Sequence, residues 1–204
     1  MNYSWIGIDG FKGKWIAVYI SDDSFDVRQF DTIADICERY PNCDSYLIDM
    51  PIGLVKNRNE LRPDLLVKKE LGKRGSSIFQ VPCRQAVYAD DKVRARESNI
   101  EVLGKSLSEQ TLGIVKGIRQ VDEFLLSHPV WKNRLLESHP EFCFAKLNGG
   151  QPVLEHKASI EGQEIRMEIL RRYYPQADGV LEKYKAYFPR RKRLDDVIDA
   201  LCWQ

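Results

Sequence analysis

The sequence contains few cysteines, and they form no recognisable pairs. Five cysteines are scattered along 204 residues, and no CxxC motif occurs. A chain of this length buries roughly 70% of the surface that its unfolded form exposes, so it needs no disulfide or structural zinc to fold. The spacing therefore argues against a disulfide framework and against a zinc site, and it favours reduced thiols in a cytoplasm.

Long apolar runs and an excess of one charge are also missing. Charged residues interrupt every apolar stretch well short of the ~18 residues of a membrane span, and the N-terminal segment lacks a basic region followed by an apolar core. We therefore expect a soluble, cytoplasmic protein with no membrane partner. Lys and Arg number 31 against 30 Asp and Glu, a net charge of +1. This balance excludes a histone-like binder but permits a basic patch beside an acidic site.

Internal repeats and low-complexity tracts are absent as well, which indicates one globular domain over residues 1–204. The last apolar segment, residues 194–203, ends at Gln204 without a helix stop signal. A complete domain would usually continue here. The sequence therefore predicts either a fragment with a truncated last helix or a naturally short chain.

Strand periodicity dominates the first fifty residues. Residues 5–8, 15–20 and 25–30 are short β-branched or aromatic segments, as is typical of hairpin strands. Glycines in the turn at residues 9–14 indicate that the first two strands pair antiparallel. A helix is predicted over residues 32–40, and the apolar run at 46–48 is typical of a buried strand. Because one helix forms a crossover, this fourth strand should lie parallel to the first.

The rest of the chain is predicted to be mostly helical. Amphipathic spacing predicts helices over residues 62–72, 108–127, 160–173 and 194–203, whereas residues 72–89 are predicted to form a loop. A brief apolar run at 135–137 predicts a fifth strand. The expected fold class is α/β, with a mixed five-stranded sheet of three antiparallel hairpin strands followed by parallel strands, and with helices on both faces.

Three acidic residues stand at the ends of apolar strand segments: Asp9, Asp49 and Glu137. Open α/β sheets place ligands at the carboxyl edge, where these side chains should meet. Converging carboxylates repel one another unless a cation or a shared proton compensates. Each acid alone is typical of a turn or a helix cap. Together, without a cysteine or histidine pair, they favour a Mg²⁺ or Mn²⁺ site.

The last predicted helix contributes further carboxylates. Asp196 and Asp199 are three residues apart, and Asp195 and Asp199 are four apart, so either pair lies on one side of a helix. About four carboxylates can hold two divalent ions, which generate hydroxide and stabilise the leaving oxygen of a phosphoryl displacement. The pattern favours hydrolysis of phosphodiester bonds.

Several short motifs follow one another along the whole chain. They are GIDG at 7–10, IDMPIGL at 48–54, RPD at 62–64, SSIF at 76–79, SEQ at 108–110, ESHPE at 137–141 and DDVIDA at 195–200. With these motifs in this order, the chain resembles the domain of unknown function 429 family, a group of predicted nucleases. The resemblance implies an RNase H-like, RuvC-type fold and a metal-dependent nuclease that acts on DNA or RNA.

The resemblance also implies roles for the acidic residues. The first-strand acid of RNase H-like nucleases matches Asp9, and the acid that ends the fourth strand matches Asp49. Resolvases of the RuvC type carry a last-helix D-x-x-D-A-L pattern, which Asp196 and Asp199 reproduce, with Asp195 as an alternative to Asp196. Five catalytic residues are expected, all but Asp196 as metal ligands: Asp9, Asp49, Glu137, Asp196 and Asp199.

The segment E-x-H-P-E leaves two alternatives open. Glu137 and Glu141 both fit the remaining acidic position. His139 either donates a proton to the leaving group or caps a helix that begins at Pro140.

Basic residues gather between residues 62 and 84 and again at 190–193. A loop that carries them can close over a polyanion, but a solvated helix face is the alternative. Lys157 and Arg166 either hold a phosphate or lie on a solvated helix. Seven residues are expected at the substrate: Lys12, Arg62, Arg74, Arg84, His139, Lys157 and Arg166.

Two other functions are compatible with such a sheet. A nucleotide-binding phosphotransferase of the actin and sugar-kinase type begins with a similar strand-Asp-Gly turn, but this sequence lacks a second glycine-rich phosphate loop. The other is an RNase H-like binding module that has lost catalysis. ATP turnover, or a metal bound at the sheet edge, would separate these functions. The sequence leaves the oligomeric state and the choice between DNA and RNA open.

Overall fold

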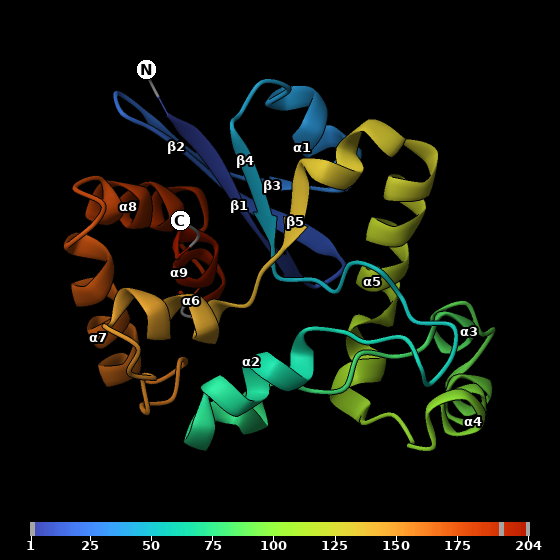
Figure 1. Cartoon of the computed structure of the whole chain (residues 1–204). Coiled ribbons are helices and arrows are strands. Elements are labelled where there is room, and N and C mark those ends of the chain that lie inside the picture. Colours follow the sequence, from blue (N-terminus) through green and yellow to red (C-terminus); the bar gives the residue numbers. More distant parts are fainter. Residues whose placement is uncertain (1–2, 192–193, 203–204) are drawn as a thin grey trace.

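The computed structural model describes residues 3–191 and 194–202, and a mixed five-stranded sheet forms its centre (Figure 1). The strands are β1 (Ser4–Phe11), β2 (Lys14–Ser21), β3 (Phe25–Phe30), β4 (Ser45–Ile48) and β5 (Leu135–Glu137), in the order β3-β2-β1-β4-β5. Strands β1, β2 and β3 pair antiparallel, whereas β4 lies parallel to β1 and β5 lies parallel to β4. The predicted α/β class and sheet are confirmed.

A tight turn joins β1 to β2 at the carboxyl end of β1. Its two central residues, Lys12 and Gly13, have positive φ angles of 46° and 79°. Two such residues form the hairpin turn whose twist matches that of the flanking strands. Lys12 is exposed at the tip of this turn.

Helices and short 3₁₀ segments make up most of the rest. They are α1 (Ile33–Arg39), α2 (Asp64–Glu70), η1 (Gly72–Ser77), α3 (Arg84–Val87), α4 (Lys92–Leu103), α5 (Glu109–Ser127), η2 (Pro129–Asn133), α6 (Pro140–Leu147), α7 (Ile160–Arg171), α8 (Ala177–Tyr187) and α9 (Asp195–Leu201). In the described ranges, no helix combines the length and the apolar character that a membrane crossing needs.

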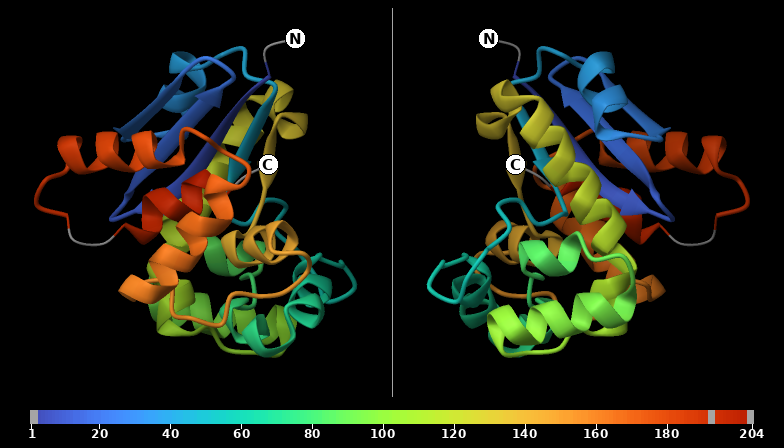
Figure 2. Two further views of the ribbon diagram at one scale, coloured as in Figure 1. Left: turned by 90° about the vertical axis from the view of Figure 1, so that its left-hand side faces the viewer. Right: turned by 90° about the vertical axis from the view of Figure 1, so that its right-hand side faces the viewer.

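The sheet has a hydrophobic core on each face, because successive strand residues point to opposite sides. On one face, Ile6 and Ile8 pack with apolar residues of α1 and α5. On the other face, Trp5 and Val18 pack with residues of α6, α7, α8 and α9. Figure 2 shows α5 and the α8–α9 pair on opposite sides of the sheet. The prediction of helices on both faces is correct.

Several predicted boundaries need correction. The segment at 72–89, predicted to be a loop, contains η1 and α3, and the helices α4 and α8 were not predicted at all. The last helix ends at Leu201 rather than at 203. Trp203 and residues 192–193 of the second basic run lie outside the described residues.

Candidate active site

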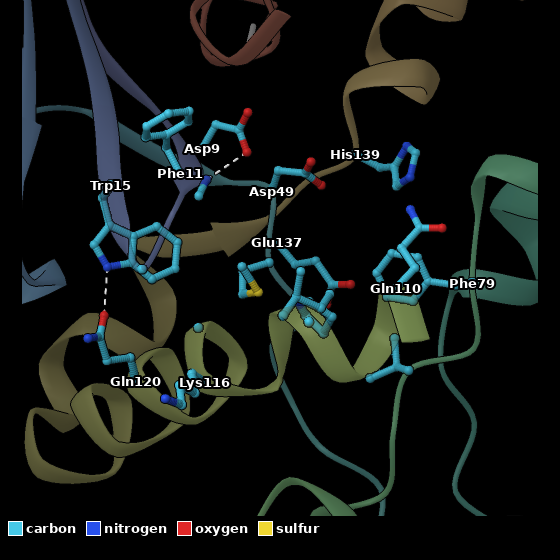
Figure 3. Close-up of a pocket in the computed structure, with 18 of the residues that line it drawn as sticks. Asp9, Phe11, Trp15, Asp49, Phe79, Gln110, Lys116, Gln120, Glu137 and His139 are labelled. Atoms are coloured by element: carbon cyan, nitrogen blue, oxygen red, sulfur yellow. Dashed lines mark hydrogen bonds between the residues drawn. The ribbon is translucent and has the colours of Figure 1, made fainter. Parts of the chain in front are cut away.

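Asp9 and Asp49 lie side by side because of strand register. Ile8 of β1 pairs with Ile48 of β4, and the N–H of Asp49 donates to the carbonyl of Ile8 at 3.0 Å. Ile8 and Ile48 both belong to the core under α5. The next residue on each strand therefore faces the opposite side of the sheet, toward α9. Figure 3 shows both carboxylates at one end of a pocket.

Glu137 ends β5, but its side chain points to the opposite face of the sheet from those of Asp9 and Asp49. It pairs with Ile48 rather than with Asp49, so its side chain leaves the sheet toward the α5 face. Its carboxylate accepts the N–H of Ile52 at 2.9 Å and two hydrogen bonds from Nη2 of Arg62 at 2.5 and 2.7 Å. Glu137 lines the same pocket as Asp9 and Asp49, yet its oxygens hold the loop that follows β4.

The electrostatics of the cluster disfavour ionised carboxylates. Burial raises the pKa of Asp9 well above its usual range, and repulsion from Asp49 and Asp199 raises it further. The pKa of Asp49 is raised to about 7 by burial and by repulsion from Asp199. Asp196, at the start of α9, adds a smaller repulsion on Asp9. A cation at this point would relieve both effects.

Asp199 is fully buried and has an internal counter-charge. Nζ of Lys157 contacts its Oδ2 at 2.5 Å, while the buried Oδ1 has no hydrogen-bond partner within the described chain. Burial raises the pKa of Asp199, and Lys157 opposes that shift. The carboxylates in turn raise the pKa of Lys157 above its usual range, against the effect of burial. Lys157 therefore belongs to the carboxylate cluster rather than to a solvated helix.

The predicted four-ligand metal site is not assembled as such. Among residues 3–191 and 194–202, no group of three or more histidine, cysteine or acidic residues is arranged to hold a metal ion. Glu137 is bound to Arg62 and Asp199 to Lys157, as described above. Asp49 makes no side-chain hydrogen bond or ion pair within the described part of the chain, and Oδ1 of Asp9 accepts the N–H of Gly10 at 2.6 Å. Of the four acids of the described chain that line the pocket, Asp64 and Glu137 are paired with Arg62, whereas Asp9 and Asp49 keep open oxygens.

A pocket of about 570 Å³ adjoins the two aspartates. Its walls come from the carboxyl edge of the sheet, the β1–β2 turn, residues 78–81 and one side of α5. This volume is within the range of small-molecule sites. Cations and aromatic rings line it together with the acids, among them Phe11, Lys12, Trp15, Phe79 and Lys116.

The four arginines expected at the substrate all have internal partners. Arg62 donates to Asp64 and Glu137 and to the carbonyls of Ile52 and Gly53. Its guanidinium thus ties α2 and the loop after β4 to the end of β5. Because these internal acceptors occupy its guanidinium, Arg62 stabilises the fold around the site.

Arg84 forms a two-point ion pair with Asp122 of α5, with distances of 2.6 and 2.7 Å. Arg74 and Arg166 both donate to Glu141, and Arg166 is only 1% exposed. The two pairs that involve Glu141 join η1, α6 and α7. They also explain Glu141, the alternative to Glu137, as an internal anchor.

His139 lines the pocket but does not cap α6 with its side chain, although it occupies the N-cap position. Burial lowers the pKa of His139 to about 4, so the ring is uncharged at neutral pH. Its buried Nδ1 has no partner among the described residues. The capping alternative is therefore wrong for the imidazole.

Several polar residues of the pocket were not predicted, and two of them, Lys116 and Gln110, have free polar groups in the described chain. Lys116 of α5 makes no hydrogen bond or ion pair in the described ranges, and neither does the amide of Gln110. Ser108 caps α5 by accepting the N–H of Thr111 at 3.1 Å, whereas Gln110 lines the pocket. The sequence does contain a signal for both residues, because helical spacing places them on the same side of α5 as two glycines, Gly113 and Gly117.

The fold and the site define an α/β protein with a carboxylate-lined pocket at the carboxyl ends of parallel strands. A family model described as "Protein of unknown function (DUF429)" matches residues 7–203. The chain therefore belongs to this family, as its motifs predicted. No curated protein and no solved structure matches the chain.

Proposed function

We propose that this protein is a metal-dependent phosphodiesterase of RNase H-like fold that cleaves nucleic acid. The observation that supports it is the pair of aspartates near the carboxyl ends of adjacent parallel strands, Asp9 within β1 and Asp49 just after β4, both with raised pKa and both open to one pocket. Carboxylates held together against their own repulsion are typical of cation sites. The strand order and directions agree with an RNase H-like sheet.

The donor set fits a hard divalent cation. Mg²⁺ is commonly bound through one or two carboxylates and the oxygens of a substrate phosphate, without a complete cage of protein ligands. Asp9 and Asp49 would hold it, and the buried free Oδ1 of Asp199 lies in the same cluster. When bound, such an ion supplies Lewis-acid stabilisation and a nucleophile at neutral pH. This arrangement makes metal binding dependent on the substrate.

The remaining residues of the site have distinct tasks in this proposal. Lys157 offsets the charge of Asp199, which keeps three acids together at one place. Lys12 and Lys116 carry charges without an ion-pair partner in the described chain and line the pocket, so they suit contacts to phosphate. The Arg62–Glu137 pair keeps Asp49 and the following loop in position.

Cleavage of labelled oligonucleotides tests the proposal. DNA and RNA are incubated with the protein in Mg²⁺, in Mn²⁺ or in EDTA, and the products are separated on a denaturing gel. We expect metal-dependent cleavage that falls about 100-fold or more in Asp9→Asn, since a metal ligand is lost. Asp22→Asn is the matched control, because Asp22 is exposed in the turn between β2 and β3.

Cleavage that persists in EDTA, or that is equal in Asp9→Asn and the parent protein, would contradict the proposal. Tight oligonucleotide binding without any cleavage would instead indicate a binding module. ATP turnover under the same conditions would favour the phosphotransferase alternative.

A further inference from the structure

The pocket is enclosed on several sides by chain segments that are distant in sequence. The carboxyl edge of the sheet brings Asp9 and Asp49, residues 78–81 cover another side, and α5 forms a further wall (Figure 3). Its volume of about 570 Å³ suits a small molecule or one part of a polymer. We propose that this pocket holds one unstacked nucleotide beside the phosphate to be cleaved, so the substrate is single-stranded nucleic acid. The inference rests on the proposed function.

The α5 wall is kept open by glycine. A Cβ atom added at Gly113 would meet no atom within 4 Å, although Gly113 lines the pocket, so the space beside it belongs to the pocket. One turn further on, a Cβ at Gly117 would come within 3.0 Å of Cε of Met50. Glycine is the least favourable helix residue apart from proline. Gly117 brings α5 close to the floor, and Gly113 leaves room above it.

The floor of the pocket is aromatic and rigid. The indole N–H of Trp15 donates to Oε1 of Gln120 on α5 at 2.7 Å. Trp15 is only 2% exposed, and Figure 3 shows its ring with Gln120 below the aspartates. The ring is held from the sheet and from the helix at once. A floor of this kind keeps the shape of the pocket when a ligand enters.

Free recognition groups lie on the side of the pocket away from Trp15. Figure 3 shows the amide of Gln110 and the ring of Phe79 there, on the same side of the view as His139. The Gln110 amide has no hydrogen-bond partner in the described chain, and the Phe79 ring is half-buried. Unstacked bases are bound by aromatic faces and by hydrogen bonds to their edges. Gln110 and Phe79 supply both kinds of contact.

The charge distribution agrees with a nucleotide in this place. Lys12 and Lys116 line the pocket without ion-pair partners in the described ranges, and a phosphodiester brings a negative charge on each side of a nucleotide. A base that is stacked and paired in a duplex would have to leave its partner before it could enter, which costs a few kcal/mol. A single strand avoids that cost.

A filled pocket tests the inference without relying on turnover. Gly113→Leu places a side chain in the open space, and Gly113→Ala adds a single carbon at the same position. Both are made in the Asp9→Asn background, and binding of a fluorescein-labelled single-stranded oligonucleotide is measured by anisotropy in Mg²⁺. We expect Gly113→Leu to weaken binding about tenfold or more, where tenfold corresponds to ~1.4 kcal/mol, and Gly113→Ala, which adds a single carbon, to weaken it severalfold less.

Folding of the variants is checked by thermal unfolding. Both should unfold at or above the temperature of the parent, because glycine is replaced by better helix formers. Competition with an unlabelled blunt duplex of the same sequence completes the experiment, and the duplex should compete at least about tenfold less well than the single strand.

The inference is overturned if a folded Gly113→Leu protein binds as tightly as its parent, or if the duplex competes as well as the single strand. Equal cleavage of single strand and duplex by the wild-type protein would overturn it as well, while leaving the proposed function intact. Conversely, loss of binding in Gly113→Leu together with no cleavage by the wild type would support the nucleotide pocket and contradict the phosphodiesterase.

Discussion

Replacing Asp49 by Asn should stabilise the protein at high pH. In the folded chain the pKa of Asp49 is raised from 3.8 to about 7 by burial and by the negative charge of Asp199. A shift of about three pH units corresponds to ~4 kcal/mol, at ~1.4 kcal/mol for each unit. This is the upper limit of what the ionised carboxylate costs the folded state. Because burial also raises the pKa values of Asp9 and Asp199 in the same cluster, removing one charge relieves only part of the cost, and we expect about half of it, ~2 kcal/mol, to be regained in the variant.

The sign of the pH dependence follows from the raised pKa. Between about pH 4 and pH 7 the folded protein binds more protons than the unfolded chain at this position, so the free energy of unfolding falls as the pH rises through that window. Above pH 7 the full penalty is present. Asp49→Asn removes the titrating group, so its stability should fall less steeply over the same range.

Urea unfolding at pH 5 and pH 8, in EDTA, measures this effect. At pH 8 the variant should exceed the wild type by ~2 kcal/mol, or by about 4–8 °C in thermal midpoint for a chain of this size. At pH 5 only about a third of the interval from pH 4 to pH 7 has been passed, so the difference should shrink to ~0.7 kcal/mol. Asp22→Asn serves as the exposed control and should follow the wild type at both values. If Asp49→Asn shows the wild-type pH dependence, the aspartates do not repel one another as the structure indicates.

Two further predictions concern cations of the site. Arg62→Met should lower the free energy of unfolding in urea by about 3–5 kcal/mol, because Glu137 is left half-buried without its partner; a loss below ~1 kcal/mol would show that the pair is solvated. In salt titrations of oligonucleotide binding, Lys12→Gln with Lys116→Gln should flatten the slope by about 1.4–1.8. Arg84→Gln should leave that slope unchanged, since Arg84 is bound to Asp122, and the opposite pattern would contradict the assignment of phosphate contacts.

The aspartates could be predicted from the sequence, but the position of Glu137 could not. Each of the three acids ends an apolar segment, and this local pattern predicts that all three reach the carboxyl edge of the sheet. Whether they face the same side depends on the register between strands. Glu137 pairs with Ile48 and not with Asp49, and one step of register moves a side chain to the other face. Register between distant strands is set by tertiary packing.

The ion-pair partners of the arginines could not be predicted from the sequence either. Arg74 and Arg166 meet at Glu141, and Arg84 meets Asp122. Each pair joins segments that lie far apart in the sequence, so composition and spacing leave a solvated face and a phosphate site indistinguishable. Lys116, which has no ion-pair partner in the described ranges, lies between Gly113 and Gly117 on α5, and only the position of α5 against the sheet shows that it faces a pocket.

The missed helices differ in how much signal they carry. Helix α4 buries little more than Ala95 and Asn99, so its sequence has almost no apolar stripe to detect. Helix α8 buries Ala177, Val180, Leu181 and Tyr184, and this regular helical spacing is present in the sequence itself.

The chain between Ile48 and Leu135 has a consequence for how this family can diversify. Strands β4 and β5 are neighbours in the sheet, yet α2, α3, α4 and α5 are all inserted between them, and this insertion supplies most of the pocket wall opposite the aspartates. Long excursions from a sheet tolerate changes in length and composition far better than the strands do. Changes within residues 49–107, between β4 and α5, can therefore alter this wall, while the strands that present Asp9 and Asp49 and the core side of α5 remain as they are.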